Sequence, residues 1–204
     1  MQCETGLALA ARQGWDRRHS MSNINAWMSW EGGVDLVAAT QEGLAMPNVI
    51  IHVARLVHTP KGSAASGMVL WQPDPAAPPA VMGFVSTDAA VGSYFGPHIF
   101  AGTPFESAPV LEASIEIEIA GDRVASKVNA GGHLFEVEFT ALGSLERINR
   151  APGGMTPFTQ DVLEAVAGTV TLKVNGAPVS ILVPPVGISG GPAAVYAAAG
   201  QYAR

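Results

Sequence analysis

The strongest constraint on the fold is a stretch of strict alternation near the middle of the chain. From residue 111 to residue 119, an apolar side chain alternates at every step with a glutamate or a serine. Successive side chains of a strand point to opposite faces, so this pattern predicts a strand with one face on a core and the other in water. The turn sequence Ala120-Gly121-Asp122-Arg123 follows, and strands are expected over residues 124–130 and 133–139. Together they predict an antiparallel meander in which Lys127 faces the glutamates of its neighbour.

Period-two patterns also occur on both sides of this meander. They predict strands over residues 49–58, 67–71, 80–85, 168–174 and 179–183. Asn175-Gly176 joins the last two segments and favours a tight turn, because a type I′ turn needs two residues at positive φ. Short helices are expected over residues 32–45, 88–95 and 195–202, the second with Thr87 or Asp88 as its N-cap. Residues 143–160 are expected to be irregular.

These elements predict a mainly β (α+β) fold with about eight strands and two or three short helices. Large antiparallel sheets of this kind commonly close on themselves, which removes their edges, and a closed sheet can enclose a pocket. We therefore expect an antiparallel barrel or sandwich with an enclosed pocket. Residues 21–204 are expected to form a single β-rich domain, and residues 1–20 a disordered or tail segment upstream of a hypothetical natural start at Met21.

The composition limits the classes of partner. Hydrophobic residues make up 48% of the chain and charged residues only 14%, well below the usual quarter. So few charges suggest that a second copy covers part of the surface, and we expect a homo-oligomer. The net charge of −6 without a basic stripe argues against nucleic acid. The apolar runs are too short for a membrane span, and the single cysteine, Cys3, fits a reducing compartment, so we expect a cytoplasmic protein with no membrane contact.

Residues 96–106, with the sequence Gly-Pro-His-Ile-Phe-Ala-Gly-Thr-Pro-Phe-Glu, are dense in glycine and proline. Such a segment follows an irregular path, and irregular segments on a rigid scaffold often carry binding and catalytic groups. The segment resembles the Gly-Arg-Glu…Gly-x-Pro-Lys-Lys block of the acetoacetate decarboxylase-like family. Its surroundings resemble the family as well: a strand, Asp88 and an Ala-rich helix precede it, and Ala108, a Glu-rich strand and the turn Gly121-Asp122-Arg123-Val124 follow it.

The resemblance, which runs from about residue 80 to residue 140, implies a mostly β fold with a cone-shaped barrel around a buried pocket, and an oligomer. The family's reaction uses a lysine of the Lys-Lys pair, whose lowered pKa lets it form a Schiff base with a keto acid. Phe105 and Glu106 stand at those two positions, and Pro97-His98 replaces the Arg-Glu pair. We therefore expect no imine-forming decarboxylase. The expected function is a small-molecule pocket protein, leaning towards a lyase-like or isomerase-like enzyme that acts on a small organic acid, ketone or lactone by acid/base chemistry.

Glu106 and His98 are the candidate catalytic residues. Both residue types transfer protons, and Glu106 stands at a catalytic position of the family. The alternatives are an exposed loop carboxylate and a loop histidine that is hydrogen-bonded to backbone. Phe105 and Tyr94 are candidate substrate-binding residues, one as pocket wall and one as hydrogen-bond donor, although both residue types usually just pack.

Arg55 is the third candidate substrate-binding residue. It shares strand parity with four apolar residues, Val49, Ile51, Val53 and Val57. An inward arginine needs a carboxylate partner from substrate or protein, whereas an edge-strand arginine covers apolar surface with its stem. His52 and His58 share the opposite parity and lie about 20 Å apart along a strand, too far for one metal ion. We see no metal signature and expect no cofactor.

The sequence Gly187-Ile188-Ser189-Gly190-Gly191 fits the Gly-x-Ser-x-Gly nucleophile elbow. That motif needs an acid and a histidine after the serine, and none follows Ser189, so a flexible Gly-rich tail is the favoured interpretation.

Three hypotheses about function remain open. The first is an enzyme in which Glu106 and His98 transfer protons and Arg55 holds a carboxylate. The second is a non-catalytic β-barrel binding protein for an apolar ligand, and the third is a structural subunit. If Glu106 and His98 project into one cavity with Arg55, the enzyme hypothesis gains support. If they point to solvent, the other two gain support.

Overall fold

The computed structural model describes residues 27–100, 102–103, 105–152, 158–188 and 190–203. The expected tail over residues 1–20, the hypothetical start at Met21 and the serine of the elbow motif lie outside the described residues. Within them the chain forms eleven strands in one sheet and a single helix, α2 (Ala89–Ile99). The predicted mainly β class is therefore confirmed.

The strands form a nearly continuous antiparallel ring. Their bounds are β1 Trp27–Ala38, β2 Val49–Thr59, β3 Gly62–Trp71, β4 Val81–Ser86, β5 Val110–Ala120, β6 Arg123–Ala130, β7 His133–Leu142, β8 Glu146–Arg150, β9 Thr159–Val174, β10 Ala177–Val179 and β11 Ala194–Ala203. Their order is β10-β9-β11-β1-β2-β3-β4-β5-β6-β7, and a pairing of β7 with β9 closes the ring. Among these described pairs only β4 and β5 run parallel.

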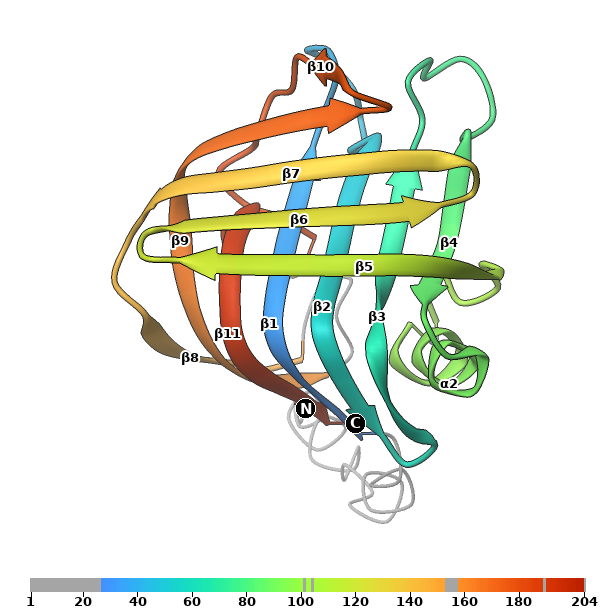
Figure 1. Ribbon diagram of the computed structural model, residues 1–204, viewed down its shortest axis with the longest axis vertical. Helices are drawn as coiled ribbons and strands as arrows, with labels where there is room; N and C mark the ends of the chain where they lie inside the picture. The colour runs from blue at the N-terminus through green and yellow to red at the C-terminus, as the bar shows by residue number, and fades with distance from the viewer. Residues whose placement is uncertain (1–26, 101, 104, 153–157, 189, 204) are drawn as a thin grey trace, which may run out of the picture.

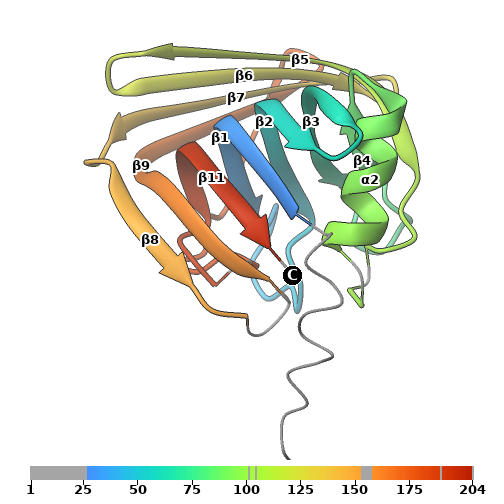
Figure 2. The same ribbon diagram turned by 90° about the horizontal axis from the view of Figure 1, so that it is seen from below.

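The ring is flattened into two layers. Strands β5, β6 and β7 cross in front of β11, β1, β2 and β3 (Figure 1), and the view from below shows the same two layers edge-on (Figure 2). The 16-residue strand β9 belongs to both layers, because its first half pairs with β11 and its second half with β7. An apolar inner cluster fills the space between the layers; it includes Leu36, Ile51, Val128, Phe135 and Phe139.

The local patterns with the clearest chemistry are confirmed. The meander occupies β5 to β7, and the wet face of β5 is exposed at every second residue. Lys127 pairs with Glu116 in the β5–β6 register, and its Nζ lies 4.0 Å from Glu136 Oε1 on β7. Asn175 and Gly176 both have positive φ, as a type I′ turn requires.

Helix α2 begins where the sequence predicts. The Asp88 side chain accepts hydrogen bonds from the backbone N–H groups of Ala90 and Val91, which fixes the helix start. Gly96 on this helix packs against the ring of Phe84, and an added Cβ would lie only 2.4 Å from Phe84 Cε2. The missing side chain at residue 96 therefore lets α2 lie close against β4.

Two predicted helices are wrong. Residues 32–45 form the second half of β1 and the turn after it, and residues 195–202 belong to β11. Helix propensity is a weak prior that tertiary pairing overrides: β1 is bonded to β2 and β11, and β11 lies between β1 and β9. The segment 143–160 is also more regular than predicted, because it contains β8 and the start of β9.

The outer face of the β11-β1-β2-β3 layer carries a second apolar cluster. It includes Trp30, Ala54, Phe84, Phe105, Phe158, Val162 and Tyr202. Strand β1 changes face at Gly32, which has a φ of 64°: Trp30 belongs to the second cluster, whereas Val34 belongs to the inner cluster. Strand β2 changes face in the same way at the register shift between Ala54 and Val57: Val53 belongs to the inner cluster, whereas Val57 belongs to the second cluster. These irregularities decide which polar residues of β1 and β2 face the second cluster.

Candidate functional site

A small cavity of about 30 Å³ lies on the second-cluster side of the sheet. Four neighbouring strands, β9, β11, β1 and β2, supply most of its lining. Arg150 from β8 and the segment Gly191-Pro192 also line it. A cavity of this size holds one water molecule or one group of similar size. Four of its lining side chains are ionisable and a fifth carries an amide: Asp35, His52, Arg150, Glu164 and Gln160.

Asp35 and His52 face each other across β1 and β2. They are directly opposite in the register, and His52 Nδ1 lies 3.4 Å from Asp35 Oδ1. Burial acts to lower the pKa of His52, but the negative charge of the neighbouring Asp35 carboxylate outweighs burial and holds that pKa above its ordinary value. His52 is therefore held as an imidazolium to a higher pH than an isolated histidine. Asp35 Oδ1 is sealed from solvent and makes no hydrogen bond within the described part of the chain.

Arg150 and Glu164 form the second charged pair. Arg150 Nη1 donates to Glu164 Oε2 at 3.1 Å, and Nη2 donates to Oε1, so the pair is bidentate. The side chains are only 17% and 7% exposed. Gly191 packs directly on the guanidinium, where an added Cβ would lie 2.3 Å from Arg150 Nη2.

Tyr202 and Gln160 complete the polar lining. Burial is the main cause that raises the pKa of Tyr202, and the charges of Asp35 and Glu164 raise it further while Arg150 lowers it. The phenol therefore stays protonated and lies within electrostatic range of both charged pairs. Gln160 is fully buried at 2% exposure on the same face of β9 as Glu164.

This arrangement has the elements of an acid/base site. Ionisable groups that are enclosed together, one with a pKa raised by a specific partner, are typical of functional sites. His52 can donate a proton and Asp35 can accept one. No lysine appears among the described residues that line the cavity. Among the described residues, no three or more His, Cys, Asp or Glu side chains lie close enough together to hold a metal ion.

The predicted catalytic residues lie elsewhere, at the end of α2 and in the loop after it. The exposed Glu106 accepts a hydrogen bond at 2.6 Å from the backbone N–H of Gly102. The exposed His98 donates from Nδ1 to the carbonyl oxygen of Tyr94 at 3.0 Å, one helical turn earlier. No hydrogen bond or ion pair between described residues joins Glu106, His98 and Arg55. Because both side chains are exposed and do not share a cavity with Arg55, their placement favours the binding-protein and structural-subunit hypotheses over catalysis by these two side chains.

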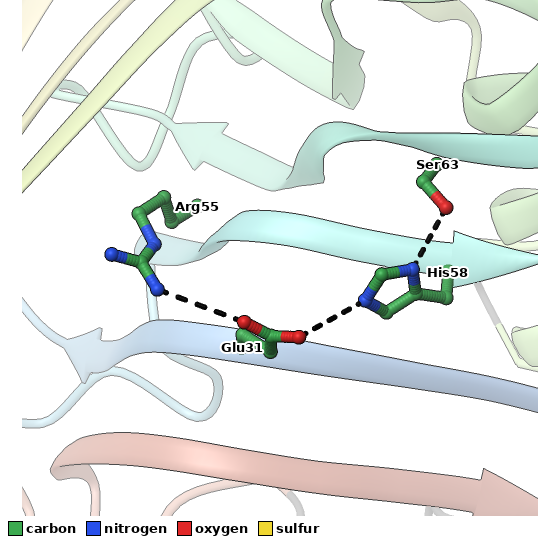
Figure 3. Close-up of polar contacts among 4 residues, drawn as sticks. All are labelled: Glu31, Arg55, His58 and Ser63. Atoms are coloured by element: carbon green, nitrogen blue, oxygen red, sulfur yellow. Dashed lines mark hydrogen bonds and ion pairs between the residues drawn. The ribbon is translucent and has the colours of Figure 1, made fainter.

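Arg55 is exposed, so the parity argument for an inward arginine is wrong. The register shift between Ala54 and Val57 interrupts the alternation, and Val57 faces the second cluster. Arg55 Nη2 lies 3.7 Å from Glu31 Oε2, and both side chains are more than half exposed. Glu31 Oε1 also lies 3.3 Å from His58 Nε2, and Ser63 Oγ lies 2.7 Å from His58 Nδ1. Figure 3 shows how these four side chains lie.

The order serine, histidine, carboxylate in Figure 3 is that of a nucleophile relay. Its members project from neighbouring positions of β1, β2 and β3, and Glu31 is shared with Arg55. Exposed ion pairs of this kind contribute little to stability. We therefore interpret the group as cross-strand pairing on the surface, and it offers a natural control for the half-buried Asp35–His52 pair on the same two strands.

The two remaining predicted residues are buried. Phe105 is 8% exposed and belongs to the second cluster, together with Trp30, Val162 and Tyr202, which line the cavity. Tyr94 is 4% exposed; its hydroxyl accepts a hydrogen bond from the backbone N–H of Trp27 at 3.2 Å. The side of the sheet on which Phe105 lies is thus the side that carries the cavity.

Sequence reasoning missed Asp35, Arg150 and Glu164. Asp35 fell in a predicted helix and Arg150 in a segment predicted to be irregular. The sequence held one signal for Glu164. Gln160, Val162 and Glu164 are spaced two residues apart, as on one face of a strand, and strand β9 places all three on the cavity side.

Comparisons with known proteins give little further guidance. No family model matches the chain, and no curated protein matches it. A search of solved structures finds acetoacetate decarboxylase from Legionella pneumophila subsp. pneumophila str. Philadelphia 1, with 8% identity and a TM-score of 0.33 over 89% of this chain and 83% of that chain. The family is the one that residues 80–140 resemble, but a likeness at this level carries no argument about fold or function. None of the described helices has the length and hydrophobicity that a bilayer span requires.

Proposed function

We propose that this protein binds a small organic acid, ketone or lactone at the cavity and transfers protons on it through Asp35 and His52. The observation that carries the proposal is the placement of two charged pairs, Asp35–His52 and Arg150–Glu164, in one cavity beneath an otherwise apolar sheet face. Buried charges cost free energy unless they are paired, so such a concentration favours a functional role over simple packing.

The proposed step is enolisation of a carbonyl compound. Asp35 takes a proton from the carbon next to the carbonyl group while His52 gives its Nδ1 or Nε2 proton to the carbonyl oxygen. The C–H bond of the ligand and the N–H bond of His52 break, and O–H bonds form on the Asp35 carboxylate and on the ligand's carbonyl oxygen. The charge of the ligand is therefore unchanged, and no Schiff base is needed. The raised pKa of His52 supports the role of acid, because it keeps the donor protonated to a higher pH than an isolated histidine.

The test is exchange of carbonyl-adjacent protons with deuterated water, followed by proton NMR. The panel contains acetone, hydroxyacetone, glycolate, pyruvate and γ-butyrolactone. Glycolate reports background, because the negative charge of its carboxylate makes removal of the neighbouring proton far harder than in a ketone. We expect the protein to accelerate exchange in at least one carbonyl compound, and Asp35→Asn and His52→Gln to abolish the acceleration.

The matched controls are Glu31→Gln and His58→Gln, which alter the exposed pair on the same two strands. They should exchange at the wild-type rate. Acceleration that survives Asp35→Asn, or that is lost equally in the controls, would remove Asp35 and His52 from the chemistry. Circular dichroism of each variant establishes that its fold is retained.

A second candidate function, binding of an apolar ligand without catalysis, is favoured by a separate cleft. This open cleft of about 440 Å³ lies between residues 37–47 and 182–188 and is lined mostly by apolar side chains. Met46 and Val186 are 53% and 59% exposed there. A neutral fluorescent dye, N-phenyl-1-naphthylamine, should bind and lose affinity in Val186→Asp but not in Ile119→Asp, which alters an exposed apolar residue at the end of β5. Equal binding by both variants would contradict this function.

A further inference from the structure

We infer that the cavity selects a neutral ligand that bears a hydroxyl group, and that this hydroxyl group enters the cavity and donates a hydrogen bond to Asp35 Oδ1. The inference rests on the proposed function, since it names the class of ligand that the same site takes. It narrows the choice among acids, ketones and lactones to neutral hydroxy compounds such as hydroxyketones.

The first argument is the charge of the site. With His52 protonated, its charge cancels that of Asp35, and the charge of Arg150 cancels that of Glu164. The Arg150 guanidinium already makes two hydrogen bonds to Glu164 and is packed against Gly191. A carboxylate ligand would therefore bring a negative charge into the cavity without a cation left to pair with it, which is costly in an enclosed site.

The second argument concerns Asp35 Oδ1, an oxygen that can accept a hydrogen bond but receives none from a described residue. Asp35 Oδ1 is sealed from solvent and makes no hydrogen bond with any described residue. Its 3.4 Å separation from His52 Nδ1 is longer than the 2.7–3.2 Å typical of such bonds. An ionised carboxylate only accepts, so the matching ligand group must carry a hydrogen on oxygen or nitrogen. A neutral ketone without a hydroxyl group cannot supply it.

The third argument is the available space. A cavity of about 30 Å³ admits a group the size of a water molecule, such as a hydroxyl group. The rest of a ligand with several heavy atoms then stays at the open side of the cavity. A hydroxyl group at the end of a short chain meets both the size and the donor requirements.

Three small compounds separate these requirements. Hydroxyacetone is neutral and carries a hydroxyl group, acetone lacks the hydroxyl group, and glycolate keeps the hydroxyl group but adds a carboxylate. Dissociation constants are measured by proton–nitrogen NMR titration of the full chain at pH 7. We expect hydroxyacetone to bind at least about tenfold more tightly than either of the others, the factor that one hydrogen bond to a charged group supplies. Asp35→Asn should reduce the preference over acetone, and Glu31→Gln should leave it unchanged.

The outcomes distinguish this inference from the proposed function. If acetone or glycolate binds as tightly as hydroxyacetone, or if the preference survives Asp35→Asn, the inference is overturned, while exchange that depends on Asp35 and His52 keeps the proposed function in place. If none of the compounds binds and none exchanges, the proposed function fails and the inference fails with it.

Discussion

The sharpest prediction concerns two arginines on β8 that make similar bidentate contacts in different surroundings. Arg150 pairs with Glu164, and the two side chains are 17% and 7% exposed. Arg147 pairs with Asp161, with Nε donating to Oδ1 at 2.9 Å and Nη2 to Oδ2 at 2.6 Å, but Arg147 is 73% exposed. Replacing each arginine by methionine keeps most of the stem and removes the donors.

The Arg150→Met variant leaves Glu164 charged, buried and without its partner. Breaking a buried ion pair in this way costs about 3–5 kcal/mol, and the partial exposure of Arg150 places the expected cost near the lower end, about 3 kcal/mol. With a denaturant slope of about 1–3 kcal/mol per molar urea, the unfolding midpoint should fall by about 1–3 M. Arg147→Met should leave the midpoint close to that of the wild type, because both partners remain hydrated.

The double variant Arg150→Met with Glu164→Leu provides the internal check. Replacing a buried pair by apolar side chains of similar size is often nearly neutral, so the double variant should regain most of the lost stability. Urea unfolding followed by tryptophan fluorescence and by circular dichroism measures all four proteins. Equal losses for Arg150→Met and Arg147→Met would refute the reasoning, because burial would then not distinguish the two pairs.

Three further predictions concern His52, Gly200 and Glu106. The pKa of His52 is raised in the folded protein, so the stability that its protonation contributes is fully present below its unfolded pKa of about 6.5 and is lost as pH rises through the raised value. Urea unfolding at pH 6 and pH 9 should therefore show a smaller difference in unfolding free energy between wild type and His52→Gln at the higher pH. Gly200→Ala should cost about 1–3 kcal/mol, because its Cβ would lie 2.3 Å from Trp30 Cζ2, whereas Gly143→Ala, with no contact shorter than 3.7 Å, should be nearly neutral in the same assay. Glu106→Gln should leave deuterium exchange of carbonyl compounds unchanged, since the Glu106 carboxylate lies away from the cavity and accepts a hydrogen bond from the backbone N–H of Gly102.

Much of the fold could be predicted because local patterns and tertiary structure agree there. The alternation of β5, the Asn175-Gly176 turn and the Asp88 cap each depend on a few neighbouring residues, and all are present. The failures occur where long-range pairing decides. Strand β11 is rich in alanine, a strong helix former, yet its place between β1 and β9 makes it a strand.

The site could not be predicted because its members come from strands far apart in the sequence. Asp35 and His52 meet only through the β1–β2 register, and Arg150 reaches Glu164 only because β8 pairs with β9. Parity counting also failed at Arg55, since a single register shift in β2 reassigns the faces of the residues after it. Alternation therefore predicts which face a residue takes only as far as the next bulge.

The most direct test of the central claim is an NMR titration of the wild-type protein with hydroxyacetone that follows the histidine side chains. Strand β2 carries two histidines near carboxylates, His52 beside Asp35 at the cavity and His58 beside Glu31 on the surface. The claim predicts saturable shifts in the imidazole signals of His52 and none in those of His58. Shifts confined to His58, or a His52 signal that does not move while hydroxyacetone binds, would contradict it.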